Sequence, residues 1–258
     1  MRVACLVTLS LLLMISLTGC GTAGNNPKEL TVSAAASLKD SLTEIQKKYL
    51  QKNPGIKLTF NFAASGTLQQ QIEQGAPVDL FISASKTQVD ALEQKNLLIK
   101  ESRVDLLGNE LVLVVGKDNT DITSIRDLTK ASVGKISIGT PGSVPAGKYA
   151  QEALTKLNLW DTLQPKMVLA AKDVTQVLNY IEAGNVDAGF VYRSDALKSN
   201  KVKVIEVVPA SSHQPIVYPA AIVASTKNMQ ETKDFIKYLQ SSEVQQVFKK
   251  YGFQILER

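Results

Sequence analysis

Short apolar runs alternate with amphipathic segments along most of the chain, and this alternation predicts strands followed by helices. An apolar strand begins at Leu30-Thr31-Val32 and ends in small residues, Ala34 to Ala36. The residues that follow recur at the spacing of one helical face: Leu38, Leu42, Ile45 and Tyr49. Because strands that alternate with helices favour parallel pairing, repetition of this unit predicts a mostly parallel sheet with helices on both faces.

A second, similar α/β unit begins near Ile122 and runs to about Val208. Two helices near the C-terminus lack strands of their own in the pattern, so the chain is expected to return to the first sheet. Leu111–Val115 and Tyr218–Ala224 are then expected to cross between two lobes and to form a hinge over a cleft. The predicted fold is α/β, with two doubly wound sheets joined by a two-strand hinge. Lobe 1 takes residues 29–109 and 222–258, and lobe 2 takes residues 110–221.

The N-terminus has the pattern of an export signal. Arg2 precedes an apolar run from residue 4 to 17, which is too short for a comfortable membrane span. Leu17-Thr18-Gly19-Cys20 resembles the lipobox of bacterial lipoproteins, which implies a signal peptide over 1–19 and a lipid on Cys20. Residues 20–28 are then a flexible tether. The expected location is the extracytoplasmic face of the cell membrane, and an uncleaved anchor is the alternative.

Composition narrows the classes of protein further. The 258 residues are 44% hydrophobic, which is enough for a sizeable core. The net charge is +5, and it becomes +4 without residues 1–19, which contain one basic residue. The lysines are scattered without interleaved aromatic residues, which argues against nucleic-acid binding. Cys5 leaves with the signal peptide, so the mature chain has no internal disulfide.

Four predicted element starts offer backbone N–H groups beside small or hydroxyl-bearing side chains: Ser37, Ser65, the Val144-Pro145-Ala146-Gly147 turn and Asp173-Val174. Ser37 is expected to cap its helix, with Asp40 completing a capping box, and Asp173 to cap another helix. Ligands of doubly wound sheets bind at the carboxyl ends of the strands, and helix N-termini favour anions. We therefore predict a small oxyanion held by neutral donors, including the hydroxyl of Tyr192. Each residue alone is also explained by a structural role.

Catalytic patterns are weak in the same sequence. The single histidine, His213, lies in a loop-like stretch far along the chain from the four element starts. The sequence contains no metal-ligand spacing, phosphate-binding glycine loop or nucleophile elbow. Asp79, Asp173 and Asp187 offer a carboxylate pair in principle, but a cap explains Asp173 better. We expect a binding protein without catalytic residues, cofactor or bare metal ion. A hydrolase or transferase on the same scaffold is the alternative.

Five segments in this order resemble the molybdate-binding proteins of ABC transporters: Ala34-Ala35-Ala36-Ser37-Leu38, Phe62-Ala63-Ala64-Ser65-Gly66-Thr67-Leu68, Gly75-Ala76-Pro77-Val78-Asp79-Leu80-Phe81-Ile82-Ser83-Ala84, Val144-Pro145-Ala146-Gly147 and Val191-Tyr192-Arg193-Ser194-Asp195-Ala196. The resemblance spans about Leu30 to Ile255. It implies the two-lobed periplasmic-binding-protein fold of the second type, a monomeric receptor, and a permease with its ATPase as partners.

The resemblance also implies a ligand and the residues that hold it. Molybdate or tungstate would be bound by Ser37, Ser65, Ala146, Val174 and Tyr192, with Ala146 and Val174 acting through backbone N–H groups. Gly66 stands where some members of the family have a serine, so a hydroxyl near the ligand is in doubt. Sulfate or another divalent oxyanion is the alternative ligand.

Overall fold

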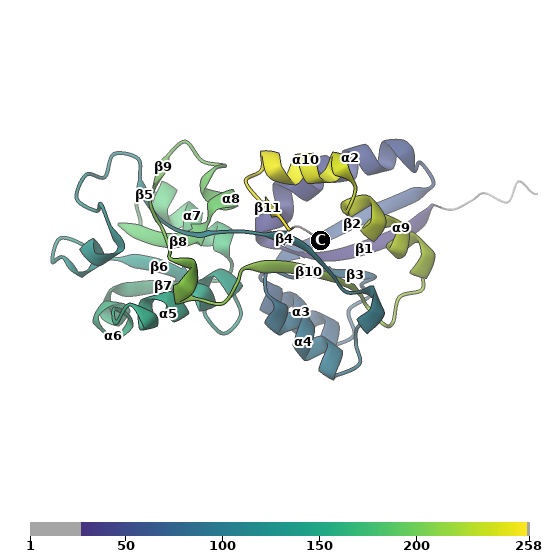
Figure 1. Ribbon diagram of the computed structural model, residues 1–258, viewed down its shortest axis with the longest axis horizontal. Helices are drawn as coiled ribbons and strands as arrows, with labels where there is room; N and C mark the ends of the chain where they lie inside the picture. The colour runs from purple at the N-terminus through teal and green to yellow at the C-terminus, as the bar shows by residue number, and fades with distance from the viewer. Residues whose placement is uncertain (1–26, 257–258) are drawn as a thin grey trace, which may run out of the picture.

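The computed structural model describes residues 27–256, apart from the side chains of residues 168 and 169, and it consists of two α/β lobes (Figure 1). The sheet of the first lobe contains, in spatial order, β11 (Gln254–Ile255), β4 (Val104–Gly108), β10 (Val217–Ile222), β3 (Leu80–Ile82), β1 (Lys28–Ala35) and β2 (Ile56–Ala63). The predicted signal peptide, Cys20 and the tether up to residue 26 lie outside the described residues. The expectation of an α/β fold with two sheets is confirmed.

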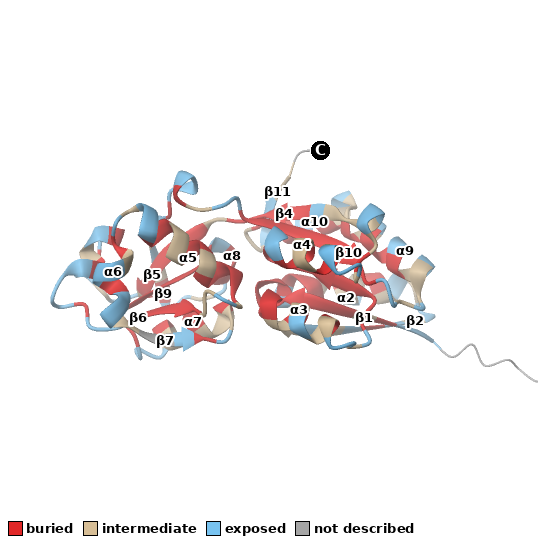
Figure 2. Cartoon of the chain, turned by 90° about the horizontal axis from the view of Figure 1, so that it is seen from below, coloured by how far each residue is buried: buried red, intermediate tan, exposed pale blue. Residues whose placement is uncertain are grey.

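Helices cover both faces of the first sheet. On one face lie α2 (Lys39–Lys52), α9 (Met229–Leu239) and α10 (Ser242–Lys250), and on the other lie α3 (Ser65–Glu73) and α4 (Lys86–Gln94) (Figure 1). The apolar stripe of α2 is buried as its spacing predicts. Tyr49 on this stripe packs edge-on against Phe235 of α9, with ring centroids 4.9 Å apart. The first sheet therefore lies between two helical layers, and its strands are largely buried (Figure 2).

The second sheet contains, in spatial order, β7 (Met167–Ala171), β6 (Ile136–Gly139), β8 (Ala188–Tyr192), β5 (Leu111–Gly116) and β9 (Val202–Val207). Its main helices are α5 (Pro145–Lys156), which packs on β6, and α7 (Val174–Glu182), which packs on β8 and β6. Its other helices are short: α6 (Trp160–Leu163), α8 (Arg193–Ala196) and the 3-10 helices η3 (Ile125–Thr129) and η4 (Gln164–Lys166). The 3-10 helices η1 (Ala36–Leu38) and η2 (Lys100–Ser102) belong to the first lobe, and η5 (Ala210–Ser212) lies on the second crossing.

Strand directions differ from the expectation of mostly parallel sheets. β1 pairs in parallel with β2 and β3, and β6 with β7 and β8. The strands next to the crossings between lobes are antiparallel: β10 with β3 and β4, and β5 with β8 and β9. Both sheets are therefore mixed, because strands entered directly from the other lobe have no crossover helix to set them parallel.

The crossings themselves lie at other residues than predicted. The chain passes between the lobes at residues 109–110, between β4 and β5, and again at residues 208–216, between β9 and β10. Leu111–Val115 belongs wholly to the second sheet, and residues 217–222 pair within the first, so a lobe boundary at 221 is wrong. A continuous apolar run indicates burial under helices on both faces, but it does not identify the sheet.

Two strands of the first sheet were not predicted. β4 has only five residues, of which Leu106 to Gly108 are buried, and β11 has two. Segments this short give no readable period. The C-terminal helices therefore do have a strand, since β11 follows α10 and pairs with β4.

Two of the carboxylates considered for a catalytic pair, Asp79 and Asp187, accept hydrogen bonds from backbone and side-chain donors. Asp79, just before β3, is buried and accepts hydrogen bonds from Thr31 N at 2.8 Å, Thr226 Oγ1 at 2.5 Å and Asn228 Nδ2 at 3.1 Å. Asp187, in the other lobe, accepts from the N–H groups of residues 134 and 135, both at 2.8 Å. Each carboxylate thus holds loops of its own lobe together.

We predict that Asp79→Ala destabilises the protein. The substitution leaves the partly buried N–H of Thr31 without this acceptor and breaks the link to the segment after β10. The free energy of unfolding should fall by about 2–4 kcal/mol, measured by urea denaturation without ligand. Asp118→Ala, at an exposed position after β5, is the control and should change it little. Equal stability of the two variants would contradict this role of Asp79.

Candidate functional site

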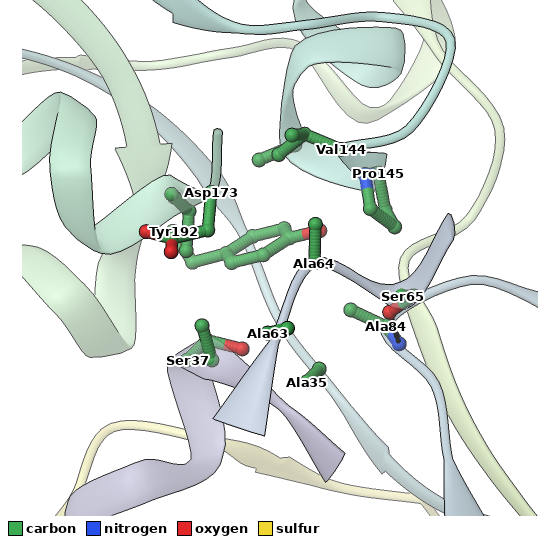
Figure 3. A pocket seen from close by; sticks show the side chains of 13 residues that line it. Ala35, Ser37, Ala63, Ala64, Ser65, Ala84, Val144, Pro145, Asp173 and Tyr192 are labelled. Atoms are coloured by element: carbon green, nitrogen blue, oxygen red, sulfur yellow. Dashed lines mark hydrogen bonds between the residues drawn. The ribbon is translucent and has the colours of Figure 1, made fainter. Parts of the chain in front are cut away.

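A small cavity lies between the two lobes, with about 210 Å³ of space between its lining atoms, including its mouth. The first lobe lines it with residues 35–37, 63–65 and Ala84, and the second lobe with residues 144–146, Asp173, Val174 and Tyr192 (Figure 3). The space open to the centre of a water-sized sphere is about 10 Å³, about the room that one water molecule needs, so this cavity fits an ion or a very small molecule. All five residues named as ligand-binding from the sequence line it.

Helix starts converge on this cavity from both lobes. The helices α3, α5 and α7 begin at it, and η1 leads into α2 beside it. The first N–H groups of a helix have no acceptor within the helix, and the helix dipole places positive charge at that end. Several such ends around one small space favour an anion.

The two helix starts of the second lobe are built from the residues that the sequence indicates. Pro145 is the first residue of α5 and Asp173 caps α7, since its Oδ1 accepts from Gln176 N at 2.9 Å. These two expectations are confirmed. A Cβ at Gly147 would lie 1.8 Å from the carbonyl oxygen of Gly139, so only glycine lets α5 start directly against the end of β6. This contact places Ala146 at the cavity.

The predicted cap at Ser37 is wrong. Ser37 lies inside η1, and the residue at the N-cap position of α2 is Leu38, with no side-chain cap. The Ser37 hydroxyl is instead 3.0 Å from the Tyr218 hydroxyl. The capping box with Asp40 is therefore absent. The Ser37 hydroxyl bonds to a residue distant in sequence and not to its own helix.

Two of the lining hydroxyls have a proton available for a ligand. Ser65 Oγ accepts the N–H of Ala84 at 2.9 Å, which leaves its own O–H to donate. The Tyr192 hydroxyl is buried and makes no hydrogen bond within the described residues. Burial raises the pKa of Tyr192 well above its ordinary value, so this hydroxyl stays protonated at physiological pH. Its ring crosses the cavity between the residues of the two lobes (Figure 3).

The charged groups near the cavity are already paired. Asp173 lines the cavity, but its carboxylate is engaged in the cap of α7 and is turned aside (Figure 3). Lys198 lies behind Ser37: its Nζ is 3.0 Å from the carbonyl oxygen of Ser37, 3.1 Å from Asp195 Oδ1 and 3.2 Å from Asp40 Oδ2. Burial opposes the charge on Lys198, but the two carboxylates raise its pKa above the ordinary value. The lining residues include no cation.

His213 is nearer the site in space than its sequence position suggests. Its ring centroid is 5.7 Å from that of Tyr149 on α5, because the second crossing segment runs beside this helix. The Tyr149 hydroxyl in turn lies 3.4 Å from the carbonyl oxygen of Ala84. His213 does not line the cavity. Within residues 27–256 no group of three or more His, Cys, Asp or Glu residues is placed to hold a metal ion.

The lobes touch each other around the cavity. Gly66 N, in the first turn of α3, donates to the carbonyl oxygen of Ser143 in the second lobe at 2.9 Å. A Cβ at Gly66 would lie 2.6 Å from that oxygen and 2.7 Å from Ser143 Cα. Lys198 also bridges the lobes, from the end of α8 to Ser37 and Asp40. The structure is therefore a closed form, and glycine at position 66 is a condition of this closure.

A cavity closed between two α/β lobes that are joined by two chain crossings defines the class of two-lobed solute-binding proteins. The family model of the bacterial extracellular solute-binding proteins matches residues 30–254. The chain belongs to this family.

The chain is similar in sequence to named relatives over most of their length. YvgL of Bacillus subtilis (strain 168), named as a substrate-binding lipoprotein of an ABC transporter, is 50% identical over 225 residues, covering 87% of this chain and 85% of YvgL. The molybdate-binding protein ModA of Haemophilus influenzae is 40% identical over 241 residues, which cover 92% of this chain and 94% of ModA. The resemblance drawn from the five segments is confirmed.

A solved structure confirms the fold. The periplasmic molybdate-binding protein of Azotobacter vinelandii superposes with a TM-score of 0.80 at 24% identity, covering 88% of this chain and 100% of that chain. At this level of identity the likeness concerns the fold alone. The roles of the five residues toward a ligand stay a prediction.

We predict that Gly66→Ala weakens ligand binding by holding the lobes apart. The added methyl group meets backbone atoms of Ser143, which cannot turn aside as a side chain would. We expect a dissociation constant for sodium molybdate at least roughly tenfold higher, since closure contacts and hydrogen bonds to a charged ligand are lost together. Titration calorimetry measures it.

Gly142→Ala is the matched control. A Cβ at Gly142 meets nothing within 4 Å, although the residue adjoins Ser143. Affinity should stay at the wild-type value in this variant. Wild-type affinity in Gly66→Ala as well would mean that the contact between Gly66 and Ser143 is not needed for closure.

Proposed function

We propose that the chain is an extracytoplasmic receptor that binds molybdate or tungstate and delivers it to an ABC permease with its ATPase. The observation that carries the proposal is the closed cavity, small and lined by neutral donors from both lobes. The names of ModA and YvgL support the ligand and the transporter respectively. The receptor is proposed to act as a monomer without cofactor.

The proposed donors match what a tetrahedral dianion needs. Ser37, Ser65, Ala146, Val174 and Tyr192 line one space. The three hydroxyls and the backbone N–H groups of Ala146 and Val174 are the proposed donors. A buried charge is costly unless it is fully hydrogen-bonded, and hydrogen bonds to a charged group are stronger than neutral ones. Helix N-termini supply further positive potential without a fixed cation. The ligand then completes the hydrogen bonding of Tyr192.

Transport fits the geometry better than catalysis. Asp79 and Asp187 are occupied by structural donors, Asp173 caps α7, and His213 does not line the cavity. The cavity residues thus offer donors but no free base or nucleophile pair. A receptor for sulfate or another divalent oxyanion is the second candidate, because sulfate has the same charge and acceptor pattern as molybdate.

Anion selectivity tests the proposal. Molybdate, tungstate and sulfate are fully deprotonated at neutral pH, whereas phosphate keeps a proton that needs an acceptor when buried. A buried donor that faces another donor costs about 1–3 kcal/mol, so phosphate should bind roughly five- to 150-fold more weakly than molybdate. Sulfate is a smaller tetrahedron than molybdate. Donors fixed on two closed lobes lie farther from its oxygens, and hydrogen bonds weaken as the donor–acceptor distance lengthens, so sulfate should bind more weakly than molybdate.

Competition calorimetry with the four anions at pH 7 and one ionic strength decides between the ligands. Tightest binding of molybdate or tungstate supports the proposed receptor. Tightest binding of sulfate would replace it by the second candidate. Phosphate binding as tight as molybdate would contradict a site of neutral donors.

A lipid on Cys20 is the proposed means of attachment. No helix within residues 27–256 is long and apolar enough to cross a membrane. The lipobox resemblance of Leu17-Thr18-Gly19-Cys20 and the naming of YvgL as a lipoprotein support an anchor at the mature N-terminus.

Replacing Cys20 tests this attachment. Cys20→Ser removes the thiol that would carry the lipid, so the variant should leave the membrane fraction in fractionated cells, as followed by immunoblotting. Cys5→Ser, inside the predicted signal peptide, is the control and should stay membrane-bound. A Cys20→Ser protein that still sediments with membranes would show that the anchor lies elsewhere.

A further inference from the structure

A buried chain of hydrogen bonds leads from Ser37 to residues that do not line the cavity. Tyr218 Oη is 3.0 Å from Ser37 Oγ and accepts from Asn109 Nδ2 at 3.2 Å. Asn109 Nδ2 also donates to Ser194 Oγ at 2.8 Å. Tyr218 and Ser194 are fully buried, and Ser37 is 1% exposed. None of these contacts depends on water at the surface.

The orientation of the Asn109 amide is fixed by the backbone. Glu110 N donates to Asn109 Oδ1 at 2.9 Å, so the oxygen of the amide faces that N–H group. The amide nitrogen must then face Ser194 and Tyr218, and an amide nitrogen can only donate. Tyr218 Oη therefore accepts a hydrogen bond from Asn109.

This orientation decides the direction of the next hydrogen bond. Burial raises the pKa of Tyr218 well above its ordinary value, so the hydroxyl keeps its proton. The proton needs an acceptor, because a buried donor without a partner is costly. Within the described residues, Tyr218 Oη makes its other hydrogen bond with Ser37 Oγ, whereas the Tyr192 hydroxyl lies near it without the geometry of a hydrogen bond. Tyr218 then donates to Ser37, and the Ser37 proton is free to point into the cavity.

We propose that Tyr218, oriented by Asn109, is a positioning residue that fixes the Ser37 hydroxyl as a donor toward the ligand. The inference rests on the proposed binding of an oxyanion. Asn109 lies on the first crossing between the lobes, and Tyr218 lies in β10, directly after the second. The two crossings thus set the direction of a donor in the cavity, and a reversed network would present an oxygen lone pair to the anion.

Tyr218→Phe tests the proposal, because it removes one hydroxyl and keeps the ring that packs edge-on against Phe253. Calorimetry with sodium molybdate should show a dissociation constant roughly two- to tenfold higher, the worth of one ordinary hydrogen bond. In a Ser37→Ala background the same change should have no further effect, since Tyr218 acts through Ser37. Circular dichroism and a thermal melt without ligand confirm that each variant is folded.

Tyr238→Phe is the matched control. Its hydroxyl is buried on α9, near Glu243, and does not line the cavity, so its removal should leave affinity unchanged. Unchanged or tighter binding in Tyr218→Phe would overturn the inference, because a Ser37 that donates to Tyr218 would gain a free proton. An equal loss with and without Ser37 would assign Tyr218 a structural role and would also overturn it. Absence of molybdate binding to the wild-type protein would refute the proposed function itself.

Discussion

Burying an anion without a countercharge is the constraint on which the proposed site depends. The lining residues include no cation, so backbone N–H groups at helix starts and hydroxyl protons would together have to replace the water that the ion loses. One lobe supplies only part of such a shell. The two-lobed arrangement follows from this need, since donors on opposite sheets surround a small ion once the lobes meet.

Closure of the lobes also depends on residues that do not line the cavity. Gly66 lets the start of α3 reach Ser143, and Gly147 lets α5 begin against β6. Lys198 bridges the lobes while its own charge is balanced by Asp195 and Asp40. A serine at position 66 of this chain would require these two loops to lie farther apart, because any Cβ there meets the backbone of Ser143. Gly66 therefore serves the fit between the lobes, and Gly147 serves the packing of α5 on β6 within the second lobe.

Much of the site was predictable because its donors sit at helix starts, and helix starts leave local signals. Pro145 at the first helical position and Asp173 at the cap identify two of them from the sequence. The serines at 37 and 65 were found as hydroxyls at strand ends, although the reason given for Ser37, a cap, was wrong. That error has a physical cause: a serine has the same local pattern whether it bonds to its own helix or to Tyr218, far away in the chain.

The sequence by itself determined the amphipathic helices, the buried strands and the places where one passes into the other, because these depend on neighbours within a few residues. Only the tertiary structure decided which sheet each apolar strand joins. Both β5 and β10 were expected to cross between the lobes, but β5 lies in the second sheet and β10 in the first. It alone also placed Asn109 beside Tyr218 and Tyr218 beside Ser37. Such pairings depend on the two crossings and on closure of the lobes, and no local spacing of residues records them.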